Sequence, residues 1–170
     1  MIYFSGFCLK DEKELFNDYL EDGEFVVSGF SYGAQKAVDY VLNSDKRVDK
    51  LQLLSPAYFN YPQKIIDMNL SAFKKDKKKY INNFLKKAGL FSIKNEELGV
   101  ENFINYNCSY EDLLSLFTFN WEKIKQIDNI KIEVFIGEFD RIVASKKAYE
   151  FFKNYAEVYY IKKANHFLRS

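Results

Sequence analysis

The chain has 170 residues, which is enough for one domain with a substantial core and too few for two independent domains. Its 25 Lys and Arg nearly balance its 24 Asp and Glu, so the net charge of +1 argues against a nucleic-acid-coating protein and against an acidic disordered tail. No run of about 18 apolar residues could span a bilayer, and the N-terminus lacks the basic and apolar stretches of a signal peptide. We therefore expect a soluble, cytoplasmic monomer that binds neither nucleic acid nor membrane.

The two cysteines, Cys8 and Cys108, lie far apart in the chain, and neither belongs to a CxxC pair. This spacing favours neither a disulfide framework nor a structural zinc site, so we expect reduced thiols. We interpret Cys8 as a small buried residue and not as a nucleophile, because it lies in no motif that would activate a thiol.

Short apolar runs rich in β-branched and aromatic residues predict strands over 2–5, 24–28, 50–55, 131–136 and 157–161. Amphipathic patterns predict helices over 11–20, 34–42 and 144–155. This alternation predicts an α/β fold with about five mostly parallel strands and helices on both faces, in a single domain over 1–170. Residues 57–128, between the third and fourth strands, show helical periodicity in the stretches 62–70, 72–88 and 110–127. We expect residues 57–128 to form an inserted helical lid.

The segment Gly29-Phe30-Ser31-Tyr32-Gly33 fits the pattern G-x-S-x-G between a predicted strand and a predicted helix. In this setting a nucleophilic serine sits on a sharp turn. The two glycines let the backbone turn tightly, so that Ser31 projects its hydroxyl clear of the sheet, and the helix that follows directs free N–H groups toward developing negative charge. The alternative is an ordinary glycine-rich turn.

Two more polar residues follow predicted strands. His166, the single histidine of the chain, follows the last strand, and Asp140 ends the segment Gly137-Glu-Phe-Asp140 after the fourth strand. Because the carboxyl ends of parallel strands meet at one edge of a sheet, both side chains should face the same crevice as Ser31. The pattern predicts a Ser-His-Asp triad. The alternative is that Asp140 caps the next helix and His166 is incidental.

These segments resemble the α/β-hydrolase superfamily over nearly the whole chain: the elbow GFSYG, the segment ending at Asp140 and the segment Ala164-Asn-His166. More narrowly, the segments Phe4-Ser-Gly-Phe7 and Leu54-Ser-Pro-Ala-Tyr-Phe59, the compact size and the lid resemble the short bacterial pimeloyl-[acyl-carrier protein] methyl ester esterases of biotin synthesis. The resemblance implies a minimal α/β-hydrolase fold. It also implies hydrolysis of that methyl ester to pimeloyl-[acyl-carrier protein] and methanol, without a cofactor or a metal.

By this resemblance, Ser31 attacks the ester carbonyl, His166 transfers the proton, and Asp140 orients the imidazole. The backbone N–H groups of Phe7 and Tyr32 would form the oxyanion hole. Two enzymatic alternatives use the same groups: an acyl-carrier-protein thioesterase and a general short-chain carboxylesterase. The alternative from another class is a catalytically silent binding module that docks a partner on the lysine-rich lid.

The lid carries seven clustered lysines: Lys74, Lys75, Lys77, Lys78, Lys79, Lys86 and Lys87. They suit an acidic surface such as the acyl carrier protein that the resemblance implies, and the alternative is a solvated helix face. Six aromatic residues at helical spacing are candidates for an acyl pocket or for plain core: Phe73, Phe84, Phe91, Phe117, Phe119 and Trp121.

Overall fold

The centre of the molecule is a sheet of five parallel strands. The computed structural model describes residues 1–93 and 99–170, so the part of the predicted lid at 94–98 lies outside the described residues. The strands are β1 (Ile2–Phe4), β2 (Val26–Phe30), β3 (Lys50–Leu54), β4 (Lys131–Gly137) and β5 (Glu157–Ile161), and they lie side by side in chain order. Each pairs in parallel with the next, so all the carboxyl ends lie at one edge. The predicted α/β fold with a parallel sheet is confirmed.

Burial of the strands explains why they read as continuous apolar runs. Every residue of β2 is buried, as are all but the first residues of β3 and β4, because both faces of the central sheet are covered. The two edge strands, β1 and β5, are only partly buried. The hydrophobic core therefore lies on both sides of the three inner strands.

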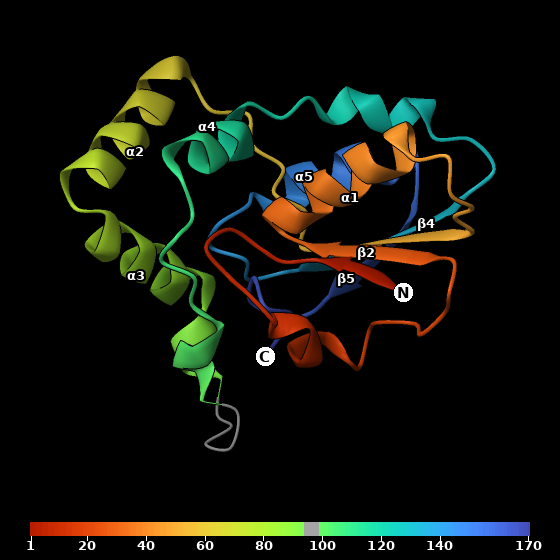
Figure 1. Cartoon of the computed structure of the whole chain (residues 1–170), viewed down its shortest axis with the longest axis horizontal. Coiled ribbons are helices and arrows are strands. Elements are labelled where there is room, and N and C mark those ends of the chain that lie inside the picture. Colours follow the sequence, from red (N-terminus) through yellow and green to blue (C-terminus); the bar gives the residue numbers. More distant parts are fainter. Residues whose placement is uncertain (94–98) are drawn as a thin grey trace.

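Two helices cover one face of the sheet. α1 (Tyr32–Asn43) connects β2 to β3, α5 (Ser145–Phe152) connects β4 to β5, and both lie above the sheet in Figure 1. The opposite face carries η1, a single short 3₁₀ helix over Glu12–Phe16, where we predicted an amphipathic helix over 11–20. The longer helix is wrong: the 3₁₀ helix ends at Phe16, and the chain leaves it through a single turn in which the N–H groups of Tyr19 and Leu20 donate to the carbonyl of Phe16.

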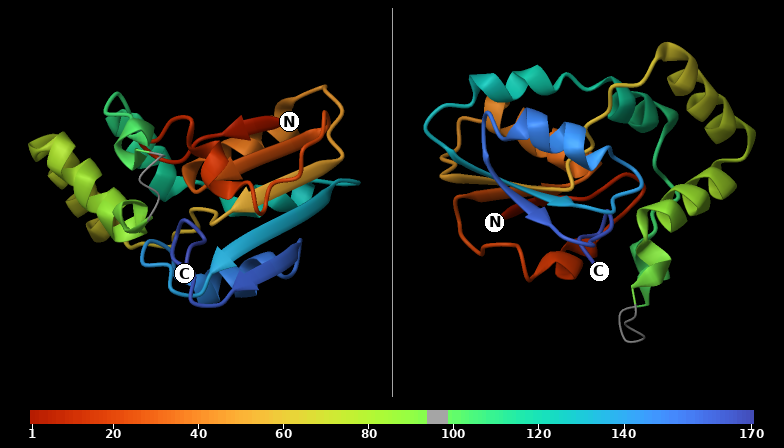
Figure 2. Two further views of the ribbon diagram at one scale, coloured as in Figure 1. Left: turned by 90° about the horizontal axis from the view of Figure 1, so that it is seen from below. Right: turned by 180° about the vertical axis from the view of Figure 1, so that it is seen from behind.

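Most of the segment between β3 and β4 stands beside the edge where the strands end, but its last part, residues 121–126, lies over α1 on the face of the sheet that α1 and α5 cover (Figures 1 and 2). Its elements are α2 (Gln63–Lys75), α3 (Lys77–Ala88), η2 (Leu90–Ser92), η3 (Val100–Phe103), α4 (Tyr110–Thr118) and η4 (Trp121–Gln126). The first two helices divide at Asp76, whose side chain accepts the N–H of Lys79 and so begins α3 later than the pattern predicts. The helix predicted over 110–127 is also divided, into α4 and η4. Among the described residues, no helix is both long enough and apolar enough to cross a bilayer.

The expectation of reduced thiols is wrong, because Cys8 and Cys108 form a disulfide. Cys8 is buried, as predicted, and its carbonyl accepts the N–H of Asn105 at 2.8 Å. The neighbouring Lys10 N–H donates to the carbonyl of Phe103 at 2.9 Å. This short antiparallel pairing brings the two cysteine Cα atoms to 5.1 Å. Spacing along the chain could not reveal it, since the pairing joins segments from opposite halves of the protein.

Candidate active site

Ser31 sits on a sharp turn between β2 and α1. Its backbone has φ 53° and ψ −111°, a conformation that a residue with a side chain rarely adopts. The Ser31 N–H donates to the carbonyl of Leu54 at 2.9 Å, which ties the turn to the end of β3. A Cβ at Gly29 would overlap the carbonyl of Gly33, and a Cβ at Gly33 would overlap the carbonyl of Phe4. Only glycine fits at these two positions, which is the physical content of the G-x-S-x-G pattern.

The loops that follow β4 and β5 are bonded to each other. The Glu138 N–H donates to the carbonyl of Ile161 at 2.9 Å, and the Phe139 N–H donates to the carbonyl of Ala164 at 2.8 Å. In the second loop, the side-chain oxygen of Asn165 accepts the N–H of Phe167 at 2.8 Å. These bonds hold the two residues before Asp140 and the residues on either side of His166, and they set the two loops at the same edge as Ser31.

Ser31, His166 and Asp140 form one continuous chain of hydrogen bonds. The Ser31 Oγ lies 2.9 Å from His166 Nε2, and His166 Nδ1 lies 2.6 Å from Asp140 Oδ2. Since a carboxylate only accepts, Nδ1 carries the proton and Nε2 faces the hydroxyl as an acceptor. Ser31 is 2% exposed and His166 is 1% exposed, so the chain is shielded from solvent. The structure thus brings together the three residues that the sequence predicted as a triad.

The second oxygen of Asp140 has a separate task. Oδ1 accepts the backbone N–H groups of Ile142 at 2.7 Å and Val143 at 2.9 Å. Asp140 does not cap α5, as the alternative interpretation held, because the N-cap position is Ala144 and receives no side-chain bond; Oδ1 instead satisfies two N–H groups of the loop before the helix. The same two bonds fix the carboxylate plane, so that Oδ2 stays directed at the imidazole.

The two N–H groups predicted as an oxyanion hole lie in different kinds of backbone. Phe7 is in a tight turn closed by the Leu9 N–H, which donates to the carbonyl of Gly6 at 3.1 Å, and Cys8 in that turn has φ 55°. Tyr32 is the first residue of α1, where N–H groups have no partner in the helix. Within residues 1–93 and 99–170, neither the Phe7 nor the Tyr32 N–H donates to a protein acceptor. Both groups are available to bind negative charge.

A pocket of about 560 Å³ lies between α2, α3 and the body of the protein. It is lined by Phe59, Tyr61, Ile65, Asn69, Ala72, Lys75, Asp76, Lys79, Tyr80, Asn83, Phe84, Lys87, Phe117 and Ile142. Ile142 places it next to the hydrogen bonds of Asp140. Burial, and then the negative charge of Asp140, raise the pKa of Tyr61, which marks the same proximity. The pocket adjoins the buried hydrogen-bond chain of Ser31, His166 and Asp140 from the Asp140 side.

The six candidate aromatic residues of the predicted lid divide between this pocket, the packed interior and, for Phe91, the surface. Phe84 and Phe117 line the pocket. The others lie elsewhere: Phe73 packs on Phe7 with ring centroids 6.3 Å apart, Phe119 packs on Trp121 at 4.9 Å, and Phe91 is exposed. Helical spacing alone could not separate the two groups.

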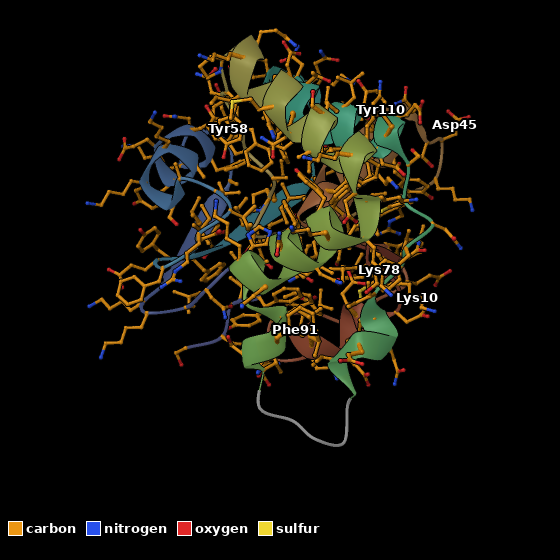
Figure 3. The ribbon with its side chains drawn as sticks, turned by 90° about the vertical axis from the view of Figure 1, so that its left-hand side faces the viewer. Lys10, Asp45, Tyr58, Lys78, Phe91 and Tyr110 are labelled. Atoms are coloured by element: carbon orange, nitrogen blue, oxygen red, sulfur yellow. A yellow bond between two sulfur atoms is a disulfide. The ribbon has the colours of Figure 1, made fainter. Side chains whose placement is uncertain are left out.

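The lysine cluster does not form one continuous face. Lys75, Lys79 and Lys87 line the pocket. Lys74, Lys77 and Lys78 instead place their ammonium groups over the rings of Tyr110, Phe73 and Tyr106, at 4.3, 5.8 and 5.6 Å. Figure 3, which faces α2 and α3, shows Lys78 and Tyr110 on the same side of these helices. Lys86 lines a separate pocket beside Phe91.

Sequence reasoning missed Glu12. It reads as a solvated acid in the first turn of an amphipathic helix, yet the structure buries it completely behind the turn that contains Phe7. No local pattern signals this, because a short helix that folds under the sheet has the same residues as one that lies on the surface.

No protein-family model and no curated protein matches this sequence. Solved structures do superpose on it. An esterase from Exiguobacterium antarcticum matches with a TM-score of 0.62 at 18% identity, over 83% of this chain and 59% of the esterase. MenH from S. aureus matches with a TM-score of 0.65 at 12% identity, over 97% of this chain and 85% of MenH. BioG from Haemophilus influenzae matches with a TM-score of 0.60 at 14% identity, over 98% of this chain and 87% of BioG. The chain has the α/β-hydrolase fold in a short form.

Proposed function

We propose that this protein is a serine carboxylesterase. The observation that carries the proposal is the unbroken hydrogen-bond chain from Ser31 through His166 to Asp140 at the carboxyl ends of β2, β5 and β4. Ser31 Oγ attacks the ester carbonyl while His166 Nε2 takes its proton, and His166 then gives that proton to the leaving alcohol. Water then attacks the acyl-enzyme ester, again with His166 as the base, and Ser31 leaves with the proton that His166 returns. Asp140 holds the imidazole in the required tautomer and stabilises the imidazolium.

The oxyanion of each tetrahedral intermediate would bind to the N–H groups of Tyr32 and Phe7. Tyr32 opens α1, a helix of 12 residues, so its N–H carries the positive end of the helix dipole. Phe7 lies in the turn after β1, the strand that pairs with β2, so the two N–H groups come from neighbouring strand ends. Two donors from two elements stabilise charge that exists only after attack, which is the condition for lowering the barrier and not merely binding the ester.

We propose a carrier-bound substrate: the methyl ester of pimeloyl-[acyl-carrier protein], cleaved to the acid and methanol. Its support is the resemblance of the segments at 4–7 and 54–59, together with the pocket that Phe59 of the second segment lines. The pocket combines an apolar part from Phe59, Phe84 and Phe117 with lysines at Lys75, Lys79 and Lys87. An aromatic interior suits an acyl chain, and ammonium groups suit the acidic carrier that presents it.

The first experiment tests the nucleophile. The wild-type protein should be labelled by a fluorophosphonate, which reacts only with an activated serine, and Ser31→Ala should lose both labelling and ester hydrolysis to below about a hundredth of the wild-type rate. The fold should survive, since removing one hydroxyl opens no cavity in the core. A wild-type protein that is folded but neither labelled nor active would instead be the silent binding module.

The product identifies the substrate class. Incubation with methyl-pimeloyl-carrier protein should release methanol and leave the acyl chain on the carrier, as determined by mass spectrometry of the intact carrier. Release of the free acyl chain would identify a thioesterase. Activity on small soluble esters alone would identify a general short-chain carboxylesterase.

The lysines at the pocket allow a matched test of the carrier. Replacing Lys75, Lys79 and Lys87 with Glu should lower kcat/KM for the carrier-bound ester by about tenfold or more and reduce its salt dependence, because charges at the rim of an interface govern encounter. Replacing Lys74, Lys77 and Lys78 with Glu changes the net charge equally and should have a much smaller effect. Equal losses from the two triple variants would contradict docking at the pocket lysines, and hydrolysis of a small ester reports any damage to packing.

A further inference from the structure

A carboxyl group that the triad does not use lies buried behind the turn after β1. Glu12 is 0% exposed, and its Oε1 accepts the backbone N–H of Gly6 at 2.8 Å and the hydroxyl of Tyr3 at 3.1 Å. Among the described residues, its Oε2 has no hydrogen-bond partner. None of the ion pairs within residues 1–93 and 99–170 includes Glu12.

Burial of such a group costs folding free energy. Burying a carboxylate without a cation and with one oxygen unsatisfied opposes folding, and burial raises the pKa of Glu12 accordingly. An apolar side chain of similar volume would fill the same space without this cost. What the carboxyl provides, and an apolar side chain does not, is an acceptor for the Gly6 N–H.

Gly6 links two peptide groups whose orientations bear on the proposed oxyanion hole. The peptide before it carries the N–H that Glu12 holds. The peptide after it contains both the Gly6 carbonyl, which accepts the Leu9 N–H, and the Phe7 N–H. In a trans peptide the carbonyl and the N–H point in opposite directions. Because the Gly6 carbonyl points into the turn toward the Leu9 N–H, the Phe7 N–H points out of the turn. A Cβ at Gly6 would lie 2.7 Å from a ring carbon of Phe30, so glycine is required there.

Glycine has the widest torsional freedom of any residue, so the two peptide groups that flank Gly6 keep a fixed orientation only if each is hydrogen-bonded. The Leu9 N–H holds one side within the turn itself. Glu12 holds the other side from a different element, η1, across the end of β1. Loss of the Glu12 acceptor would release the first peptide and let the second rotate, together with the Phe7 N–H.

We propose that Glu12 is a positioning residue for the oxyanion hole: its carboxyl oxygen anchors the Gly6 N–H and thereby directs the Phe7 N–H at the oxyanion. This inference rests on the proposed esterase function. Glu12 does not touch the reacting atoms, so its effect should appear in transition-state stabilisation and leave substrate binding unchanged.

The kinetic test uses three variants on a small soluble ester. Glu12→Met keeps the volume and removes the acceptor, and it should lower kcat by about tenfold to a hundredfold with KM nearly unchanged. Glu12→Gln keeps an amide oxygen for the Gly6 N–H and should retain most of the activity. Glu14→Ala, an exposed acid on the same short helix, is the matched control and should match wild type. Wild-type kcat in Glu12→Met, or equal losses in the Met and Gln variants, would overturn the proposal.

A second readout does not depend on activity. In ¹⁵N-labelled protein, Glu12→Met should move the Gly6 amide proton to higher field, since its hydrogen bond to a carboxyl is lost, and should broaden or shift the Phe7 amide. Glu12→Gln should change both less. Unchanged Gly6 and Phe7 signals in Glu12→Met would refute the positioning role even if the esterase is active. If Glu12→Met does not fold, the Gly6 and Phe7 amides in Glu12→Ala decide the question.

If the wild-type protein is neither labelled nor active, the proposed function fails, and the role in catalysis fails with it. The amide signals would still show whether Glu12 orders the turn. The two failures are therefore distinguishable.

Discussion

Asp140 shows how one residue serves both the fold and the proposed chemistry. Oδ1 satisfies two backbone N–H groups in the loop after β4, and Oδ2 meets His166 Nδ1 at 2.6 Å. The first pair of bonds orients the carboxylate so that the second can form. This division of tasks predicts that the two functions can be separated by mutation.

In Asp140→Asn, the amide oxygen should keep the two backbone bonds, so the amide nitrogen would face His166. Since that nitrogen is a donor, Nδ1 could no longer carry the proton and the imidazole would present the wrong tautomer to Ser31. We expect kcat to fall by roughly 10³- to 10⁴-fold with little change in the unfolding temperature. Asp128→Asn, at an exposed site, is the control. Retention of more than a tenth of the wild-type kcat, measured at saturating ester, would contradict the assignment of Asp140.

At the scale of elements, α2 and α3 supply more than half of the residues that line the pocket. Phe84 of α3 also packs edge-to-face on Phe7, with ring centroids 5.4 Å apart. The two helices therefore meet both the space proposed for the acyl chain and the turn proposed for the oxyanion. A change on their inner face should alter substrate preference and leave the chemistry intact.

Ala72, on α2, lines the pocket. Ala72→Trp would add a large ring to this space, so hydrolysis of a long-chain ester should fall by about tenfold or more relative to an acetate ester, whose acyl group does not need the pocket. Ser71→Trp places the same ring at the neighbouring exposed position and should leave the ratio unchanged. The measurement is the ratio of kcat/KM values for octanoate and acetate esters of one chromogenic alcohol. An unchanged ratio in Ala72→Trp would mean that the acyl chain binds elsewhere.

At the scale of the whole molecule, the disulfide joins the turn after β1 to the segment that leads into α4. It closes a separation of 100 residues between Cys8 and Cys108. A cross-link that spans so long a loop restricts the unfolded chain strongly. The bond also bears on the expectation of a cytoplasmic protein, because disulfides are rare in the reducing cytosol.

Reduction should lower the free energy of unfolding by about 2–5 kcal/mol, and Cys108→Ser should cause a similar loss. Denaturant unfolding with and without a reductant measures the difference, and the Cys108→Ser variant, which cannot form the bond, should be insensitive to the reductant. Complete alkylation of both wild-type cysteines in denaturant before any reduction would contradict the presence of the bond.

Several features of the fold and of the candidate site could be predicted from the sequence, because they depend on neighbours in the chain. The five strands are apolar runs bounded by turn residues, and their order follows from alternation with helices. Gly29 and Gly33 mark the elbow because no other residue fits so close to the carbonyl groups that surround it. Ser31, Asp140 and His166 each follow a strand, and parallel pairing alone brings the ends of those strands to one edge.

Other features were decided only by the tertiary structure. Cys8 and Cys108 meet because residues 8–10 pair with residues 103–105, and Glu12 is buried because η1 folds beneath the sheet. Six of the seven lysines divide between the pocket and aromatic rings, according to which segment packs beside each face of α2 and α3. The physical reason is common to all three: a local pattern determines which face of an element is apolar, whereas the partner of that face is determined by segments far away in the chain, whose contacts form only when the whole domain packs.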